Sequence, residues 1–436
     1  MDYSRRIGEA VHDAQQLEAI YQAATQTGQV TTFAAAIEAC YADDPDNLLY
    51  AAWHYRLAAQ RTTPPVEQSR NWRVAILLSV ACGLILWLLS DEKQYVVHKI
   101  PLFVFTAVPI SAGFIMLFLS LALRAYPRRL FLLALGLLGF VLYALQAVHW
   151  LDTNARQDDY LQIAALHLPL LAWVAVGIYL LWQNGAPDER FAFLIKSLEV
   201  IVTGGLFGGA GAVFTAVAFG MFQALDIKLP DLVMRLFFAG GAGLIPVLAV
   251  ATVYRPDASP LAQSFSQGLG KLIVTINRLL LPLTLLVLMV YIVFIPFNFM
   301  QPFHNRDVLI VYNGMLFGVM ALLVGATPVR DTDLSLRLGD FLRRTILIVV
   351  VLVVLVGLYA MAAILYRTWQ GGFTPNRVTV LGWNGINIAL LLLLLYKQRK
   401  TKPEHWLATL RETLSVGMNM YTAWGIVVVL LLPWFF

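Results

Sequence analysis

Apolar and polar positions alternate along this chain on two different scales. Before Trp72 they mix within each helical turn, and from Trp72 onward whole apolar runs alternate with short polar segments. Runs of about twenty apolar residues cross a bilayer as helices, in which every backbone polar group is paired. Eleven spans are predicted, at residues 72–90, 100–123, 130–151, 161–182, 197–224, 231–254, 274–296, 308–328, 342–366, 378–396 and 413–434. The pattern predicts an all-α polytopic membrane protein with about eleven transmembrane helices.

The N-terminal part has the periodicity of small amphipathic helices. Apolar side chains recur at helical spacing in three stretches, residues 7–24, 33–41 and 49–57. We expect a cytoplasmic three-helix domain at residues 1–61, a linker at 62–71 and a transmembrane domain at 72–436. Because a core built from about sixty residues is marginal on its own, we expect this domain to dock on the membrane part or on a cytoplasmic protein partner.

Lysine and arginine are distributed unevenly between the two sides that these spans define. With a cytoplasmic N-terminus, 23 of the 31 basic residues fall on the cytoplasmic side and eight on the other. Short loops rich in lysine and arginine stay in the cytoplasm. We therefore expect the N-terminus inside, Phe436 outside, and anionic lipid headgroups as partners of the cytoplasmic loops. The basic residues form no stripe with interleaved aromatics, which argues against nucleic-acid binding.

Composition and motifs narrow the function classes further. Only 13% of the residues are charged, against about 25% in soluble domains. Cys40 and Cys82 lie in unlike settings and predict no disulfide. His149 and His167 flank one outer loop but match no ligand spacing, so we expect no metal and no cofactor. The sequence has no phosphate loop and no metalloprotease, hydrolase or dinucleotide motif, and we expect no enzyme activity.

Glycines are concentrated in two consecutive spans. The fifth span contains Gly204, Gly205, Gly208, Gly209, Gly211 and Gly220, and the sixth contains Gly240, Gly241 and Gly243, with Pro246 shortly after. Small residues four apart let helices approach closely in lipid, so we expect these two spans to pack tightly against each other. The alternative is a flexible or broken pair of helices that lines a substrate path.

Two charged residues lie near the ends of these same spans. Glu199 follows Lys196 by three residues, and Arg235 follows Asp231 by four. These spacings favour local ion pairs on a helix surface. The alternative for both Glu199 and Arg235 is a functional site, because charge at membrane depth is costly.

Asparagines occur inside several late spans. Asn313, Asn384 and Asn387 are expected to join helices through hydrogen bonds. If they face one cavity, they form a neutral polar site instead. The sequence leaves both interpretations open.

The segment from Tyr366 to Asn387 has the most unusual backbone chemistry in the chain. Gly371 and Gly372 permit a tight turn, and we expect Asn376 to cap the tenth span. Arg377 then lies in the first helical turn, where the helix dipole disfavours a cation. It needs a carboxylate, carbonyl or phosphate partner. It is either a headgroup contact or an anion-facing or gating residue on the outer side.

The hexapeptide Gly372-Phe373-Thr374-Pro375-Asn376-Arg377 resembles the Gly-x-Thr-Pro-Asn-Arg signature of a bacterial multi-pass family, catalogued as domain of unknown function 4153. The segments Thr203–Gly209 and Lys271–Pro282 look like earlier blocks of that family, so the resemblance covers roughly residues 70 to 400. It implies a protein of the bacterial cytoplasmic (inner) membrane with many helices. It implies no catalytic residues.

Three functions are compatible with these features. The first is a small-solute transporter or channel-like permease, favoured by glycine-rich spans and by polar side chains in late helices. The second is a sensor or accessory subunit whose N-terminal domain binds a cytoplasmic partner within a homo- or hetero-oligomer. The third is a membrane enzyme acting on lipid-linked substrates, with Arg367 and Arg377 as phosphate binders. A transporter requires a cavity reached by Asn384, Asn387 or Glu199, and an enzyme requires an outer pocket that joins Arg377 to a carboxylate.

Overall fold

The fold is that of a helical protein in two units. The computed structural model describes residues 3–11, 13–26, 29–62, 72–91, 93–96, 100–265, 268–330 and 334–436. Within these residues the only β-structure is an isolated bridge between Tyr95 and Pro101. The chain divides into the units Met1–Arg70 and Asn71–Phe436, which are described separately below.

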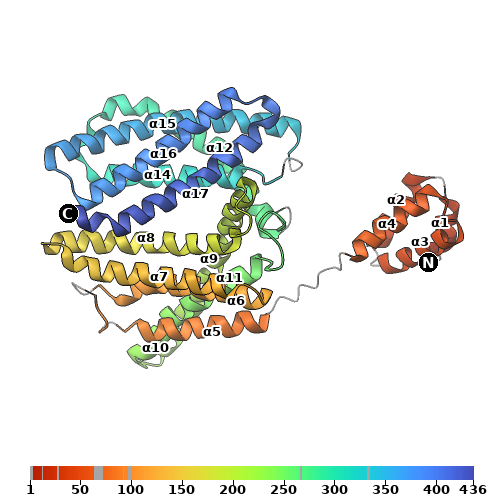
Figure 1. Ribbon diagram of the computed structural model, residues 1–436, viewed down its shortest axis with the longest axis horizontal. Coiled ribbons are helices and arrows are strands. Elements are labelled where there is room, and N and C mark those ends of the chain that lie inside the picture. The colour runs from red at the N-terminus through yellow and green to blue at the C-terminus, as the bar shows by residue number, and fades with distance from the viewer. Residues whose placement is uncertain are drawn as a thin grey trace. The chain divides into compact units, whose positions relative to one another are not determined.

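The described part of the first unit contains four helices. They are α1 (Tyr3–Glu9), α2 (Ala14–Gln26), α3 (Val30–Asp43) and α4 (Leu48–Thr62) (Figure 1). The predicted three-helix domain is corrected on this point, because the first predicted helix is split between α1 and α2. Asp13 causes the split, since its Oδ1 accepts hydrogen bonds from the backbone amides of Gln15 and Gln16 and so starts a new helix.

This unit has its own aromatic core. The ring of Phe33 lies 5.6 Å from that of Trp53 and 5.5 Å from that of Tyr21. Arg56 covers this cluster, with its guanidinium 4.4 Å from the Trp53 ring and 2.9 Å from the Glu18 carboxylate. Of the predicted linker, only Thr62 belongs to the described residues, at the end of α4.

The described residues of the second unit include eleven helices long and apolar enough to cross a membrane, which confirms the predicted fold class. Their bounds are α5 (Trp72–Leu89), α6 (Leu102–Leu123), α7 (Pro127–Ala147), α8 (Asn154–Leu181), α9 (Pro187–Ala224), α10 to α11 (Asp231–Val253, with a π-helical turn at Leu236–Gly240), α12 (Gly268–Phe294), α14 (Arg306–Ala326), α15 (Leu336–Gly371), α16 (Pro375–Lys400) and α17 (Trp406–Leu430). Short helices α13 (Gln301–His304) and α18 (Leu432–Phe435) complete it.

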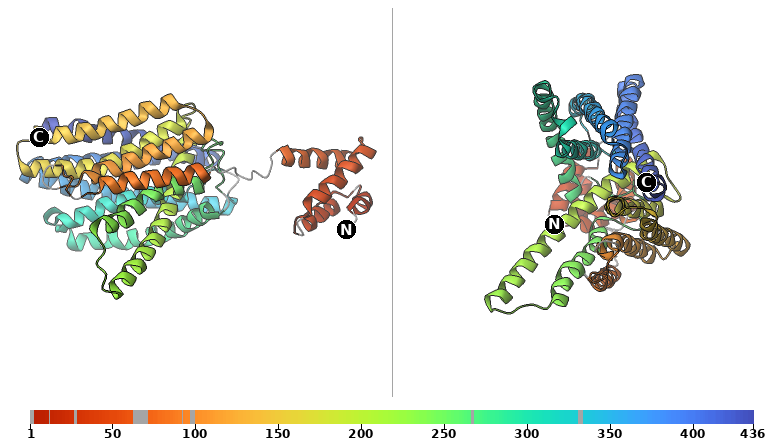
Figure 2. Two further views of the ribbon diagram at one scale, coloured as in Figure 1. Left: turned by 90° about the horizontal axis from the view of Figure 1, so that it is seen from below. Right: turned by 90° about the vertical axis from the view of Figure 1, so that its left-hand side faces the viewer.

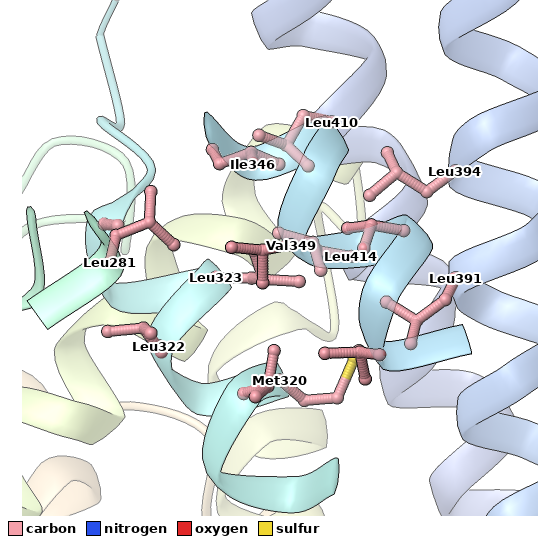
Figure 3. Packing of buried hydrophobic residues seen from close by; sticks show 14 of the residues in the cluster. Leu281, Met320, Leu322, Leu323, Ile346, Val349, Leu391, Leu394, Leu410 and Leu414 are labelled. Carbon is pink, nitrogen blue, oxygen red and sulfur yellow. The ribbon is translucent and has the colours of Figure 1, made fainter. Parts of the chain in front are cut away.

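The largest buried cluster of this unit joins its late helices. Leu281 of α12, Leu323 of α14, Val349 of α15, Leu391 of α16 and Leu414 of α17 pack together (Figure 3). Lipid tails are as apolar as these side chains, so shape-matched packing holds the helices together rather than exclusion of water. The cluster fixes α14, α15 and α16 relative to one another, and these helices carry the site described below.

The backbones of α5 and of the start of α11 approach each other closely at glycines. A Cβ added to Gly243 would lie 2.7 Å from Cα of Gly83, and one added to Gly83 would lie 2.7 Å from the carbonyl oxygen of Gly240. In α9, Gly204 and Gly208 face the side chain of Ile245 at ordinary contact distances of 3.5 and 3.8 Å. The expected packing of the fifth span on the sixth is therefore found at Gly204 and Gly208, and the sixth span in addition makes a closer backbone contact with the first at Gly83 and Gly243.

The second half of α9 leaves the body of this unit. Figure 2 shows it diverging, together with the segment that leads into α11, from the other helices. A Cβ added to Gly205, Gly209, Gly211 or Gly220 would meet no atom within 4 Å. Val213, Phe214 and Met221 are exposed on the same half-helix. Only the first half of α9 therefore packs in the bundle.

Gly243→Ala should destabilise the unit by about 1–3 kcal/mol, the usual cost of overpacking. The new methyl group would meet the backbone of α5, which cannot move aside as a side chain can. The measurement is the apparent Tm and the monodisperse yield in detergent. Gly209→Ala is the matched control, because its methyl enters open space and alanine favours a helix. Equal stability of the two variants would contradict the assigned α5–α11 contact.

Candidate functional site

The turn between α15 and α16 is built around glycine. α15 ends at Gly371, and Gly372 has a φ of 73°, in the left-handed region that glycine adopts without strain. Thr374 then begins α16, since its Oγ1 accepts a hydrogen bond from the backbone amide of Arg377 at 3.3 Å. Pro375 occupies the first helical position, where no backbone donor is needed. The segment thus reverses direction and starts a helix within four residues.

Asn376 does not cap α16 as the sequence predicts, because Thr374 already does so. Its Nδ2 instead donates a 2.8 Å hydrogen bond to Oδ1 of Asp159 in α8. Asn376 therefore ties the start of α16 to α8. This contact joins residues 217 positions apart, and no local pattern could show it.

Arg377 folds back over the turn. Its Nη1 donates to the carbonyl oxygen of Gly372 at 2.6 Å, so the partner is one of the three kinds that the sequence requires. A Cβ on Gly371 would lie 2.8 Å from Nη1 and 2.9 Å from Nη2 of Arg377. The position of this guanidinium therefore explains why residue 371 is also glycine. A guanidinium carries five N–H donors, and this bond uses one of them. Arg377 also lines the space beside the helix start.

That space is a cavity of about 360 Å³, here called the α14–α16 pocket. Its lining comes from four helices: Asp159 of α8, Arg306, Leu309, Ile310 and Asn313 of α14, Ile364 and Arg367 of α15, and Thr374, Asn376, Arg377 and Val380 at the start of α16. It lies at the end of the bundle that holds the C-terminus (Figure 1), where Arg156 of α8 donates to the Phe436 carbonyl at 2.6 Å. The sequence predicts that this end faces outward.

The charges around the pocket do not balance. Arg306, Arg367 and Arg377 contribute three positive charges from three helices, and Asp159 contributes the negative charge in the lining. Nη1 of Arg367 and Oδ1 of Asn313 are buried without a hydrogen-bond partner among the described residues. Buried polar atoms are normally paired, often with water or ligand. The pocket therefore provides a net positive charge and two polar atoms that no other part of the described chain pairs.

This arrangement suits an anion. Guanidinium groups bind carboxylate and phosphate oxygens through paired hydrogen bonds. The N-termini of α14 and α16 open at the pocket and add partial positive charge. The lining includes no histidine, cysteine or lysine, and its one hydroxyl, that of Thr374, caps α16.

Three of the seven predicted positions meet here, namely Asn313, Asn376 and Arg377. Asp159 and Arg306 were not predicted as site residues. A signal for Arg306 was present, because it is one of the few basic residues predicted on the outer side, together with Arg367 and Arg377. Nothing in the sequence distinguishes Asp159 from neighbouring loop acids.

Glu199 and Arg235 lie elsewhere, in ion pairs. Glu199 is buried and accepts a 2.6 Å hydrogen bond from Nζ of Lys196, as the spacing predicts. A Cβ on Gly270 of α12 would lie 3.2 Å from this carboxylate, so the pair fills a gap between α9 and α12.

Arg235 joins the end of α5 to α10. Its guanidinium lies 3.8 Å from the predicted partner Asp231 and 3.6 Å from Asp91. It also donates to Oγ of Ser90 and to the carbonyl oxygen of Trp87, each at 3.1 Å. These contacts account for the charge without a ligand.

Asn384 and Asn387 are fully buried on α16. Tyr421 of α17 donates to Oδ1 of Asn387 at 2.5 Å, the kind of interhelical bond that the sequence predicts. The Nδ2 atoms of both asparagines have no partner among the described residues. They lie deeper in the bundle than the pocket and do not line it.

His167 is buried within α8 rather than beside the outer loop. Its Nδ1 contacts the carbonyl oxygen of Ile163 at 2.7 Å, and its Nε2 accepts from the indole of Trp383 at 2.9 Å. Both ring nitrogens are therefore engaged in helix contacts. Within the described chain, no cluster of three or more potential metal ligands occurs.

A second cavity, of about 230 Å³, is almost entirely apolar. It lies among α6, α8, α9 and α11, and the helix prolines Pro169 and Pro246 line it. Lys196 is the charged residue in its lining, and Glu199, Asn384 and Asn387 are not part of it. The cavity that the transporter interpretation requires is therefore not this one.

Comparison with known proteins gave no relatives. No family model matches the chain, and no match was found among curated proteins or solved structures. The resemblance at Gly372–Arg377 stays a prediction.

Lys196→Met should destabilise the second unit strongly, by about 3–5 kcal/mol, because it leaves the Glu199 carboxylate buried without its partner. The double variant Lys196→Met/Glu199→Leu should recover most of this loss. A double-mutant cycle of apparent Tm values measures the difference. A double variant that is as unstable as Lys196→Met would show that Glu199 has another essential partner.

Proposed function

We propose that this integral membrane protein is a permease-like transporter and that its α14–α16 pocket recognises an anionic solute. The observation that carries the proposal is the convergence of Arg306, Arg367 and Arg377, from three helices, on one cavity. Surface arginines that reach lipid headgroups spread outward. These three line a common space that also contains polar atoms without protein partners.

The position of the pocket on α16 supports transport. Asn384 and Asn387 lie about 10 and 15 Å beyond Arg377 along this helix, at 1.5 Å per residue. Their buried amide nitrogens lack acceptors among the described residues. Polar groups at membrane depth are costly and commonly mark a solute path. Because neither described cavity is lined by Asn384 or Asn387, the proposed transport requires a conformational change that connects the pocket to these donors.

A second candidate function follows from Asp159. The pocket joins Arg377 to a carboxylate, which is the arrangement expected of an enzyme acting on lipid-linked substrates. Asp159 is engaged by Asn376, and the lining offers no activated nucleophile. We therefore favour binding and transport over catalysis.

Inorganic phosphate and succinate, added at constant ionic strength, should raise the apparent Tm of the protein in nanodiscs. The variant Arg367→Gln/Arg377→Gln should lose this response, because it removes the two guanidiniums nearest the α15–α16 turn. Arg156→Gln is the control, since Arg156 lies at the same end but outside the lining.

Uptake of radiolabelled forms of the same anions into proteoliposomes tests the transport half of the proposal. We expect uptake by the wild type and by Arg156→Gln, and at least a tenfold loss in the double variant. Binding that depends on the arginines without any uptake would overturn the permease assignment and leave the anion site in place.

A further inference from the structure

The lining of the α14–α16 pocket is part charged and part apolar. Each of α14, α15 and α16 contributes an arginine and, one turn away, an apolar side chain, namely Leu309 and Ile310, Ile364 and Val380. A small hydrophilic anion would leave these apolar side chains in contact with nothing apolar. An amphipathic ligand would use both kinds of lining residue.

One apolar lining residue also belongs to the exposed surface of the bundle. Ile310 is 57% exposed, and its neighbour Val311, outside the lining, is 68% exposed, both on α14. Exposed apolar side chains of a membrane-spanning helix contact lipid. The double exposure of Ile310 is the basis on which we place an opening of the pocket toward the bilayer.

Aromatic residues mark the depth of the pocket in the membrane. Trp369, 91% exposed, and Phe373, 71% exposed, flank the glycine turn that positions Arg377. Exposed tryptophan is enriched at the level of the lipid headgroups. The pocket thus lies where the phosphates of membrane lipids lie.

We infer that the ligand of this pocket is a phosphoryl group on an apolar stem, which enters from the outer leaflet of the bilayer. The inference rests on the proposed anion binding and names its substrate class. It applies whether the ligand is then transported or chemically altered.

Charge favours a phosphoryl group over a carboxylate. Three guanidiniums and Asp159 leave two positive charges, and two helix N-termini add to them. A carboxylate carries one negative charge and fills one guanidinium fork. A phosphate monoester carries up to two charges and three acceptor oxygens, which three forks from different helices can share.

Size agrees with this assignment. A volume of about 360 Å³ is at the small end of the range of ligand sites, roughly 300–1,000 Å³. It accommodates a phosphoryl group and the first part of a stem against Ile310 and Val380. The rest of the stem would stay in the lipid.

The test compares octyl phosphate, glycerol 1-phosphate and octanoate, below their micelle concentrations, with the full chain in zwitterionic nanodiscs. Octyl phosphate should bind at least tenfold more tightly than glycerol 1-phosphate, since burying two methylenes is worth about that factor. It should also bind more tightly than octanoate, whose carboxylate carries one charge and fills one guanidinium fork. Dioleoyl phosphatidic acid incorporated in the nanodisc should compete with it, whereas glycerol 1-phosphate in solution should compete only weakly.

Two sets of variants distinguish the contribution of the apolar lining residues to binding from that of the arginines. Ile310→Ser/Val380→Thr should abolish the preference for octyl phosphate and keep the affinity for glycerol 1-phosphate. Arg367→Gln/Arg377→Gln should lose both ligands. Ile348→Ser, at an exposed position of α15 outside the lining, is the control for a lipid-facing substitution and should change neither.

Each alternative result has a definite meaning. Equal binding of octyl phosphate and glycerol 1-phosphate would overturn the apolar stem, and equal binding of octyl phosphate and octanoate would overturn the phosphoryl group. Failure of phosphatidic acid to compete would overturn entry from the bilayer. In these cases the proposed anion site stands. If no anion binds, the proposed function fails as well.

Discussion

The backbone has to satisfy its own hydrogen bonds wherever the chain crosses lipid, and the rest of the second unit depends on this constraint. It forces every long apolar run into a helix and moves irregular backbone to the ends of the bundle. The tight glycine turn at Gly371 and Gly372 lies at such an end. There the chain can reverse, expose carbonyl oxygens and gather charged side chains. The pocket lies at this end of the bundle, where the backbone no longer has to satisfy all of its own hydrogen bonds.

Packing without a hydrophobic driving force explains how these helices are held in place. The α5–α11 contact brings two backbones together at Gly83 and Gly243, where any side chain would separate them. The late helices instead interdigitate larger side chains such as Leu323 and Val349. The second half of α9 makes neither a close backbone contact through its glycines nor a packed contact with the late cluster, and it diverges from the other helices (Figure 2). The packed cluster of the late helices thus supports the pocket, while the second half of α9 does not belong to that cluster.

The sequence was sufficient for the parts of the structure that depend on local pattern. It predicted the eleven spans, the Lys196–Glu199 pair and the special role of the Gly371–Arg377 turn. It failed where partners are distant. Asp159 takes the hydrogen bond of Asn376, and the sixth span packs on the first as well as on the fifth, because helix order in space is not encoded in periodicity. The break between α1 and α2 was missed for a smaller reason, since one capping aspartate overrode a continuous apolar stripe.

Arg306 and Arg377 each oppose two general preferences. Both are basic residues on the side that the charge distribution predicts to be outer, and both lie in the first turn of a helix, where the dipole repels a cation. Asp307 compensates in the first turn of α14 but is not part of the pocket lining. The Gly372 carbonyl offsets part of the charge of Arg377. A structural role alone would be served as well by an uncharged donor. Guanidiniums in this position raise the positive potential of the pocket, and this is the basis on which we propose an anionic ligand.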